Sequence, residues 1–205
     1  MSFKPKPAGS NFPPVPAGTH HAICYSIVDI GTHYNEKYDK TAQKVIFTFE
    51  LPDVRIDIDK DGEKKNLPRA ISQTYTLSFH EKANLTKDIT AWRGKPIGSD
   101  EEGVISGRLG ENCLLTITNT TKDGRTYANI AGIAGLMSSM TPKKPENPAV
   151  IYEIESGEPP EAIPQWIRDR IKESKEFQAM SDNAQELPCD YTGSEPTPGD
   201  DIPWE

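Results

Sequence analysis

The sequence lacks the features that mark several common classes of protein. It has only three cysteines, Cys24, Cys113 and Cys189, which form no CxxC pair and lie far apart. Because disulfide frameworks and zinc sites need paired or closely spaced cysteines, we expect neither. No run of about 18 apolar residues occurs, and the N-terminus has no apolar segment of the kind found in signal peptides. These absences predict a soluble, cytoplasmic protein without a membrane anchor.

Catalytic signatures are missing as well. The sequence contains no HExxH, GxSxG or GxxxxGK[ST] pattern, which would hold a catalytic zinc, a nucleophilic serine or a nucleotide phosphate. His20 and His21 are adjacent, so in a strand they would point to opposite faces. Asp57, Asp59 and Asp61 have the spacing of a calcium loop, but no Glu follows where that loop needs one. We therefore expect no enzymatic activity, no metal and no cofactor.

Charge is distributed unevenly along the chain. The net formal charge is -8, which by itself argues against a partner with a phosphate backbone. However, residues 1–144 contain 19 Lys and Arg against 16 Asp and Glu, whereas residues 145–205 contain 4 against 15. A slightly basic part is thus followed by a strongly acidic one, which is typical of a binding domain with an acidic tail.

Proline-rich and polar segments divide the chain. Five prolines in residues 1–16 favour an extended arm. Residues 17–136 carry the hydrophobic pattern of one folded domain, and residues 137–163 are a proline-rich linker in which VIYEI could add a short edge strand. A short amphipathic helix is predicted at residues 164–175, with Trp166, Ile167 and Ile171 on one face. Residues 176–205 contain eight acidic and no basic residues, and they are predicted to be disordered.

Five strands are predicted in the domain. HAICYSIVDIG, KVIFTFEL and AISQTYTLSF are rich in β-branched and aromatic residues, and the last two alternate apolar with polar side chains, as strands with one buried face do. The segment between the second and third strands, DIDKDGEKKN, is polar and is interpreted as a loop. NCLLTITNTT and RTYANIAGIA flank an Asp-Gly turn, which indicates a closing hairpin.

One helix is predicted between the third and fourth strands. Ser78 and Glu81 have the spacing of a capping box, and Gly94 supplies the stop. Three apolar residues recur between them at helical spacing, namely Leu85, Ile89 and Trp92. This order predicts a mainly β fold, a five-stranded OB-fold barrel with a helix between strands 3 and 4, whose strand 2–3 face and loops commonly bind oligonucleotides. An unrelated small β-barrel or sandwich is the alternative.

Two loops carry the side chains that a binder of single strands needs. Cations pair with phosphates, and aromatic rings stack on bases at about 1 to 3 kcal/mol per base. The loop between strands 1 and 2, with the start of strand 2, provides Tyr34, Lys37, Tyr38, Lys40 and Lys44. The last hairpin provides Lys122, Arg125 and Tyr127. In an OB-fold the two loops would face each other across the barrel mouth. The alternative is that these side chains only keep exposed loops soluble.

Other aromatic and basic residues are interpreted as mainly structural. The rings on the apolar phase of their strands are predicted to be core residues: Phe47, Phe49, Tyr75 and Phe79. Arg93 and Lys95 either favour the end of the helix or contact a phosphate. Three further cations, Lys64, Lys65 and Arg69, lie among acidic residues, which favours a solvated loop.

The segment YTLSFHEKANLTKDITAWRGKP (75–96) resembles a family of tailed-bacteriophage single-stranded DNA-binding proteins. PVPAGTHHAICYSIVDIG before it and GENCLLTITNTTKDGRTYANIAGIAGL after it agree, so that the resemblance spans residues 12–175. It implies an OB-fold, binding of single-stranded DNA, and a role in phage replication or recombination in the cytoplasm of an infected bacterium.

The last residues, DDIPWE, resemble the acidic tip of bacterial single-stranded DNA-binding proteins, which usually ends Asp-Asp-Ile-Pro-Phe. The match covers Asp200, Asp201, Ile202, Pro203 and Trp204. Glu205 departs from it, because the aromatic residue is no longer last. A charged peptide needs no exposed hydrophobic residues for solubility, so this tip favours a tail that recruits replication or recombination proteins.

The sequence therefore predicts a non-enzymatic, largely sequence-independent protein that coats and protects single-stranded DNA and that could form homo-oligomers. The alternatives are a recombination mediator or strand-annealing protein, a metal-dependent nuclease, and a virion or assembly protein whose barrel binds protein without DNA affinity.

Overall fold

In the computed structural model of the protein, residues 13–36, 39–60, 63–98 and 103–185 are described, and they form a mainly β fold with three α-helices. In chain order the elements are β1 (Gly18–Asn35), β2 (Lys40–Lys60), β3 (Glu63–Thr76), α1 (Asn84–Arg93), η1 (Ser106–Arg108), β4 (Asn112–Lys122), β5 (Arg125–Gly135), β6 (Val150–Tyr152), η2 (Ile154–Ser156), α2 (Gln165–Lys172) and α3 (Lys175–Gln185). The five predicted strands, the helix before β4 and the short strand in VIYEI are confirmed. None of the described helices is long and apolar enough to cross a membrane.

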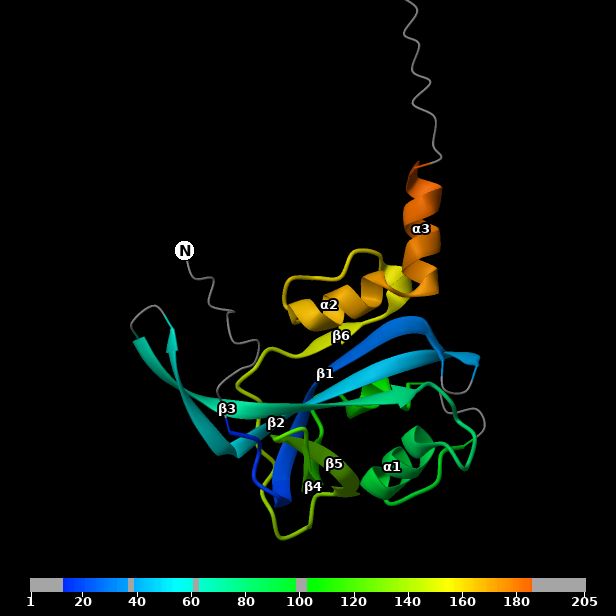
Figure 1. Ribbon diagram of the computed structural model, residues 1–205. Coiled ribbons are helices and arrows are strands. Elements are labelled where there is room, and N and C mark those ends of the chain that lie inside the picture. Colours follow the sequence, from blue (N-terminus) through cyan, green and yellow to red (C-terminus); the bar gives the residue numbers. More distant parts are fainter. Residues whose placement is uncertain (1–12, 37–38, 61–62, 99–102, 186–205) are drawn as a thin grey trace, which may run out of the picture.

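The strands form one six-stranded sheet in the order β3-β2-β1-β4-β5, with β6 added beside β1. The main path is antiparallel, and β6 runs parallel to β1. Strand β1 curves (Figure 1) and is shared, because residues 18–23 pair with β4, residues 23–35 with β2 and residues 26–28 with β6. Within the described ranges no pairing joins β3 to β5, so the sheet is not closed into a barrel.

The inner face of the sheet carries the main core. Phe47, Phe49 and Tyr75 are buried there, together with Leu85, Ile89 and Trp92 from α1, as predicted. The Trp92 indole donates a hydrogen bond to the backbone oxygen of Asn112 at 3.0 Å, which ties the helix to β4. Phe79 was predicted to be a core residue, and this is wrong: it is 53% exposed. β3 ends at Thr76, so the alternation that would have turned Phe79 inward has already stopped.

Local sequence correctly predicts the turn after β4 and the end of α1, but not the start of α1. Asp123 and Gly124 both have positive φ (52° and 73°), which is the backbone of the two-residue hairpin turn that Asp-Gly favours. Gly94 ends α1 in the left-handed conformation, as predicted. The predicted capping box is wrong, because α1 begins after Ala83 and has no side-chain cap.

Residues 45–51 of β2 are buried on both faces of the strand, not on one as the alternation predicted. Ile46, Thr48 and Glu50 alternate with the inner aromatic residues and are also buried. Ile46 packs in a second hydrophobic cluster with Val28 and Ile30 of β1 and with isoleucines from beyond residue 150. Figure 1 shows the cause: β6 and α2 lie over β1 on the side opposite α1. We call β6, η2, α2 and α3 the C-terminal layer.

The C-terminal helices differ from the prediction. The helix expected at residues 164–175 is confirmed as α2, whereas residues 176–185, expected to be disordered, belong to a further helix, α3. The buried Ser174 caps α3 by accepting the Phe177 N–H at 3.2 Å, and Phe177 packs against the second cluster. Trp166 was expected beside Ile167 and Ile171, but it is 51% exposed whereas both isoleucines are buried. Residues 186–205 lie outside the described residues.

The polar segment between the second and third strands is not a loop. β2 and β3 stay paired out to Lys60 and Glu63, and this hairpin arm projects beyond the rest of the sheet (Figure 1). Ile56 lies opposite Leu67, and Ile58 lies opposite Lys65. The regular alternation of Val, Ile and Ile with Arg, Asp and Asp in residues 54–59 was the signal for a strand, and the high charge of the segment concealed it.

Candidate nucleic-acid interface

Tyr34 and Lys40 lie at the turn that joins β1 to β2. The Tyr34 ring is 55% exposed, and its hydroxyl donates a hydrogen bond to Asp39 Oδ1 at 2.7 Å. This hydrogen bond raises the pKa of Tyr34, and it fixes the ring beside a turn whose Asp39 has a φ of 46°. Lys40 is exposed, whereas Lys44 is half-buried between its strand partners Gly31 and Thr76. Lys37 and Tyr38 lie outside the described residues.

The β4–β5 hairpin presents the second predicted set. Lys122 and Arg125 face each other across the turn and are exposed, and neither side chain has a hydrogen bond or an ion pair within the described chain. Tyr127 lies opposite Thr120 and is 50% exposed. Cations without partners keep their full attraction for an incoming phosphate, so this hairpin end can bind an anion without first breaking a contact.

The strand register places the two sets at opposite ends of β1. The first residue of β1, Gly18, pairs with Ile117, so the rest of β4 and the hairpin turn extend past this end. The other end of β1 leads into the turn with Tyr34 and Lys40. A ligand that touches both sets must therefore extend along the sheet. That the two loops face each other across a barrel mouth stays a prediction.

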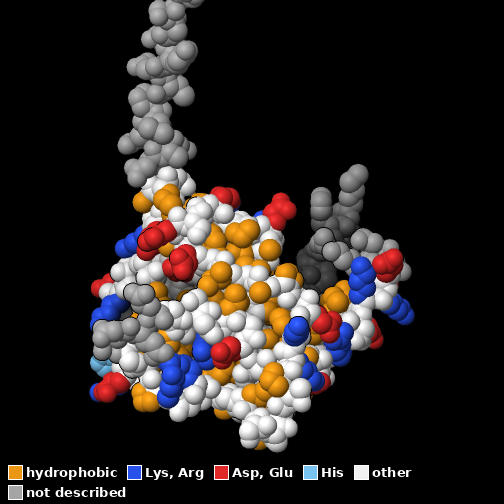
Figure 2. Space-filling model, turned by 180° about the vertical axis from the view of Figure 1, so that it is seen from behind, with side chains coloured by type: hydrophobic (Ala, Val, Ile, Leu, Met, Phe, Trp, Pro, Cys, Tyr) orange, Lys and Arg blue, Asp and Glu red, His pale blue; other side chains and the backbone are white. Residues whose placement is uncertain are grey.

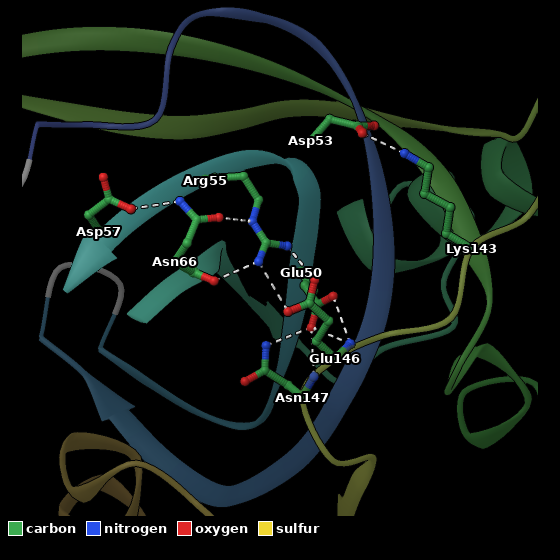
Figure 3. Close-up of polar contacts among 8 residues, drawn as sticks. All are labelled: Glu50, Asp53, Arg55, Asp57, Asn66, Lys143, Glu146 and Asn147. Atoms are coloured by element: carbon green, nitrogen blue, oxygen red, sulfur yellow. Dashed lines mark hydrogen bonds and ion pairs between the residues drawn. The ribbon is translucent and has the colours of Figure 1, made fainter. Parts of the chain in front are cut away.

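The outer face of β2 is closed by a strap, residues 143–147 (Figure 3). The fully buried carboxylate of Glu50 accepts hydrogen bonds from the backbone N–H groups of Glu146 and Asn147, at 2.9 and 2.8 Å, and from the Asn147 side chain at 2.6 Å. A buried carboxylate is stabilised when such donors surround it. The strap therefore covers part of the outer face of β2.

Two ion pairs reinforce the strap from the base of the arm. Arg55 pairs with Glu146 and also donates to Asn66, and Lys143 pairs with Asp53 (Figure 3). The hydrogen bond from Arg55 holds the pKa of Glu146 below its ordinary value. Sequence reasoning missed this network. The available signal was the single acidic residue, Glu50, inside the apolar run KVIFTFEL.

Arg93 and Lys95 lie at the end of α1. A hollow of about 770 Å³ opens there, lined by both residues and by Ala91, Arg108 and Leu136. Arg108 lies over the Trp92 ring, 5.5 Å from its centre, and pairs with Glu111 at 2.7 Å. The structure thus gathers three cations around this hollow, although Arg108 was not predicted as part of any site.

The two cysteines of the described ranges lie inside the fold. Cys24 and Cys113 are buried free thiols, and burial raises the pKa of Cys24 to about 12 and raises that of Cys113 as well. Both therefore remain protonated and unreactive near neutral pH. In the part of the chain that is described, no three His, Cys, Asp or Glu side chains are grouped so that they could hold a metal.

A scan against protein-family models and a search of the curated proteins find no match to this chain. The resemblance to phage single-stranded DNA-binding proteins therefore stays a prediction. The same holds for the recruiting tip, residues 200–204, which lies outside the described residues.

Proposed function

We propose that the protein is a non-enzymatic single-stranded DNA-binding protein that acts largely independently of sequence. One observation carries this proposal: two separate hairpin ends each present an exposed tyrosine beside exposed cations, Tyr34 with Lys40, and Tyr127 with Lys122 and Arg125. Rings that stack on bases and cations that contact phosphates are the two components of sequence-tolerant binding to single strands. Neither tyrosine is needed to fill the core.

The strand order supports an open OB-fold as the finer description of the sheet. An OB-fold is a partly open five-stranded Greek-key barrel whose loops after strands 1 and 4 bind oligonucleotides. Three features are compatible with an open OB-fold: the strand order β3-β2-β1-β4-β5, the pairing of β1 with both β2 and β4, and the helix between β3 and β4. In this interpretation the two tyrosine-bearing hairpin ends are the two binding loops.

The biological setting is proposed from the sequence. The resemblance implies that the protein coats and protects single strands during phage replication or recombination, in the cytoplasm of the infected host. The acidic tip, Asp200 to Trp204, would recruit replication proteins. A strand-annealing protein would also bind single strands, so an annealing assay with complementary oligonucleotides separates that role from simple coating.

Fluorescence anisotropy with matched single- and double-stranded oligonucleotides tests the proposal. We expect preference for the single strand, and a slope of log K against log salt of roughly -3 to -4 if about four to six phosphates are contacted. Tyr34→Ala and Tyr127→Ala should each weaken binding by about 1 to 3 kcal/mol. Trp166→Ala, which removes another exposed ring on α2, is the matched control and should change nothing. Absence of single-strand affinity, or a flat salt dependence, would contradict the proposal.

The acidic tail should compete with DNA for the cations of the domain, because its carboxylates are tethered at high effective concentration. A chain that ends after Gln185 keeps α3 and removes residues 186–205. This shortened chain should bind single strands more tightly at low salt, and the gain should shrink as salt screens the tail.

Trp204→Ala should leave DNA affinity unchanged and weaken the capture of replication proteins.

A further inference from the structure

Phe79 is an exposed aromatic residue held in a fixed loop. It lies between β3 and α1, where the Thr86 hydroxyl donates to the Ser78 oxygen at 3.1 Å and the Ala83 N–H donates to the His80 oxygen at 2.8 Å. The Leu77 N–H donates to the Gln43 oxygen at 2.8 Å, which attaches the loop to the start of β2. Lys40 is only three residues earlier in that strand. The backbone on both sides of Phe79 is therefore held by hydrogen bonds, and the loop lies beside the strand that begins at one of the two proposed binding loops.

Two hollows follow α1 from Phe79 onward. The first, about 650 Å³, is lined by Phe79, Lys87, Ala91, Pro96 and Ile97. The second is the 770 Å³ hollow with Arg93, Lys95 and Arg108, and it shares Ala91 with the first. Because α1 has 10 residues, the two hollows together follow a helix about 15 Å long.

Charge separates these hollows from a third one on the other side of Phe79. The third hollow, about 470 Å³, has an apolar floor that includes Val45 and Leu77, and the charged residues that line it are all acidic: Asp29, Glu153 and Glu155. Among the described residues that line the two hollows along α1, the cations Lys87, Arg93, Lys95 and Arg108 outnumber Glu81 and Glu111, and Arg108 and Glu111 pair with each other. Figure 2 shows hydrophobic side chains gathered in a band across this face, with acidic and basic side chains both above and below it. A phosphate backbone is repelled from the third hollow and attracted along α1.

We propose that single-stranded DNA runs along α1, with a base stacked on Phe79 and phosphates at Lys87 and Lys95. The inference rests on the proposed function and deepens it, since it assigns the part of the strand path that follows the Tyr34 turn. An apolar patch can also dock a protein segment. The cations along α1 favour the nucleic acid, because apolar docking needs none of them.

Four variants of the full chain test this path by anisotropy. Phe79→Ala should weaken binding to a single strand by roughly 5- to 150-fold, without a change in the salt slope, whereas Phe79→Tyr should restore it. Lys87→Gln and Lys95→Gln should each reduce the salt slope by about 0.7. Trp166→Ala and Lys64→Gln, an exposed ring and an exposed cation elsewhere, are the matched controls. Because Phe79 is exposed, we expect its variants to unfold at the wild-type temperature. A thermal unfolding curve for each variant checks that it is folded.

Photo-crosslinking gives an independent result. An oligonucleotide with 5-iodouracil, irradiated in complex with the wild-type chain, should yield a crosslinked peptide that contains Phe79. Wild-type affinity in Phe79→Ala, together with crosslinks only at Tyr34 or Tyr127, would overturn this path and leave the proposed function standing. Failure of the wild-type chain to bind single strands would instead refute the proposed function itself.

Discussion

The two hydrophobic clusters of this protein are built in different ways. The inner cluster draws on strands β1 to β5 and on α1, and it contains four packed rings: Phe47, Phe49, Tyr75 and Trp92. The outer cluster consists mainly of isoleucines, and it joins β1 and β2 to a layer formed after residue 150. The inner cluster thus holds the sheet itself together, whereas the outer cluster attaches a separate segment to it.

Polar contacts differ between the two regions as well. On the outer side of the sheet, carboxylates hold both the strap and the C-terminal layer: Glu50 binds the strap, and Glu176 accepts the Thr32 N–H at 2.7 Å where α3 meets β1. Gly31 permits this close approach, since a Cβ there would lie 2.7 Å from Ser174 Cβ. The hydrophobic cluster that attaches the C-terminal layer is smaller than the inner cluster, so we expect this layer to detach before the sheet unfolds. Four substitutions test that expectation.

Phe49→Ala should have the largest effect. It removes a fully buried ring that packs against Phe47 and Trp92, and we expect a loss of about 3 to 5 kcal/mol in the free energy of unfolding. Chemical denaturation followed by circular dichroism measures it. Retention of near wild-type stability would mean that the inner cluster does not dominate.

Ile171→Ala should loosen the C-terminal layer without loosening the rest of the sheet. Ile171 is fully buried in the second cluster, and truncation of such a residue costs about 2 to 5 kcal/mol. Hydrogen exchange should accelerate in β6, α2 and α3 and stay slow in β4 and β5. Equal acceleration of exchange in both regions would show that the sheet and the C-terminal layer unfold as one unit. That result would contradict the expectation that the layer detaches first.

Glu50→Gln should release the strap at a smaller cost. The amide keeps one oxygen acceptor, but it replaces the other with a donor that would face N–H groups, so a loss of roughly 1 to 3 kcal/mol is expected. Exchange of the Glu146 and Asn147 amides is the measurement. Asp53→Asn, which removes only the exposed pair with Lys143, is the control and should cost less than about 1 kcal/mol.

Glu176→Gln should have the smallest effect, and it should depend on pH. Burial raises the pKa of Glu176, but hydrogen bonds from Thr32 outweigh burial, so the pKa lies below its ordinary value. The carboxylate therefore stabilises the folded state above the unfolded-state pKa of about 4.3, and this contribution disappears as the pH falls through the folded-state value. Exchange of the Thr32 amide should differ between the wild type and the variant at pH 6 and converge near pH 3. A difference that does not vary with pH would contradict this role.

The sequence predicted most of the local structure and part of the candidate interface. Alternating hydrophobic residues located the strands, helical spacing located α1 with its buried Trp92, and Asp-Gly located the β4–β5 turn. Tyr34 and Tyr127 were predicted as exposed rings from their positions at turns. These features follow from neighbouring residues, which is the range over which periodicity and turn chemistry act.

The order of residues along the chain by itself determined that the described part is mainly β and that a basic part is followed by an acidic part. Only the tertiary structure decided that residues 45–51 of β2 are buried on both faces, that α3 forms, and that Phe79 is exposed. The first two depend on residues far apart in the sequence: Glu50 meets the strap 96 residues later, and Glu176 meets Thr32 144 residues earlier. A local pattern carries no information about such partners, because the partner supplies the burial or the hydrogen bond.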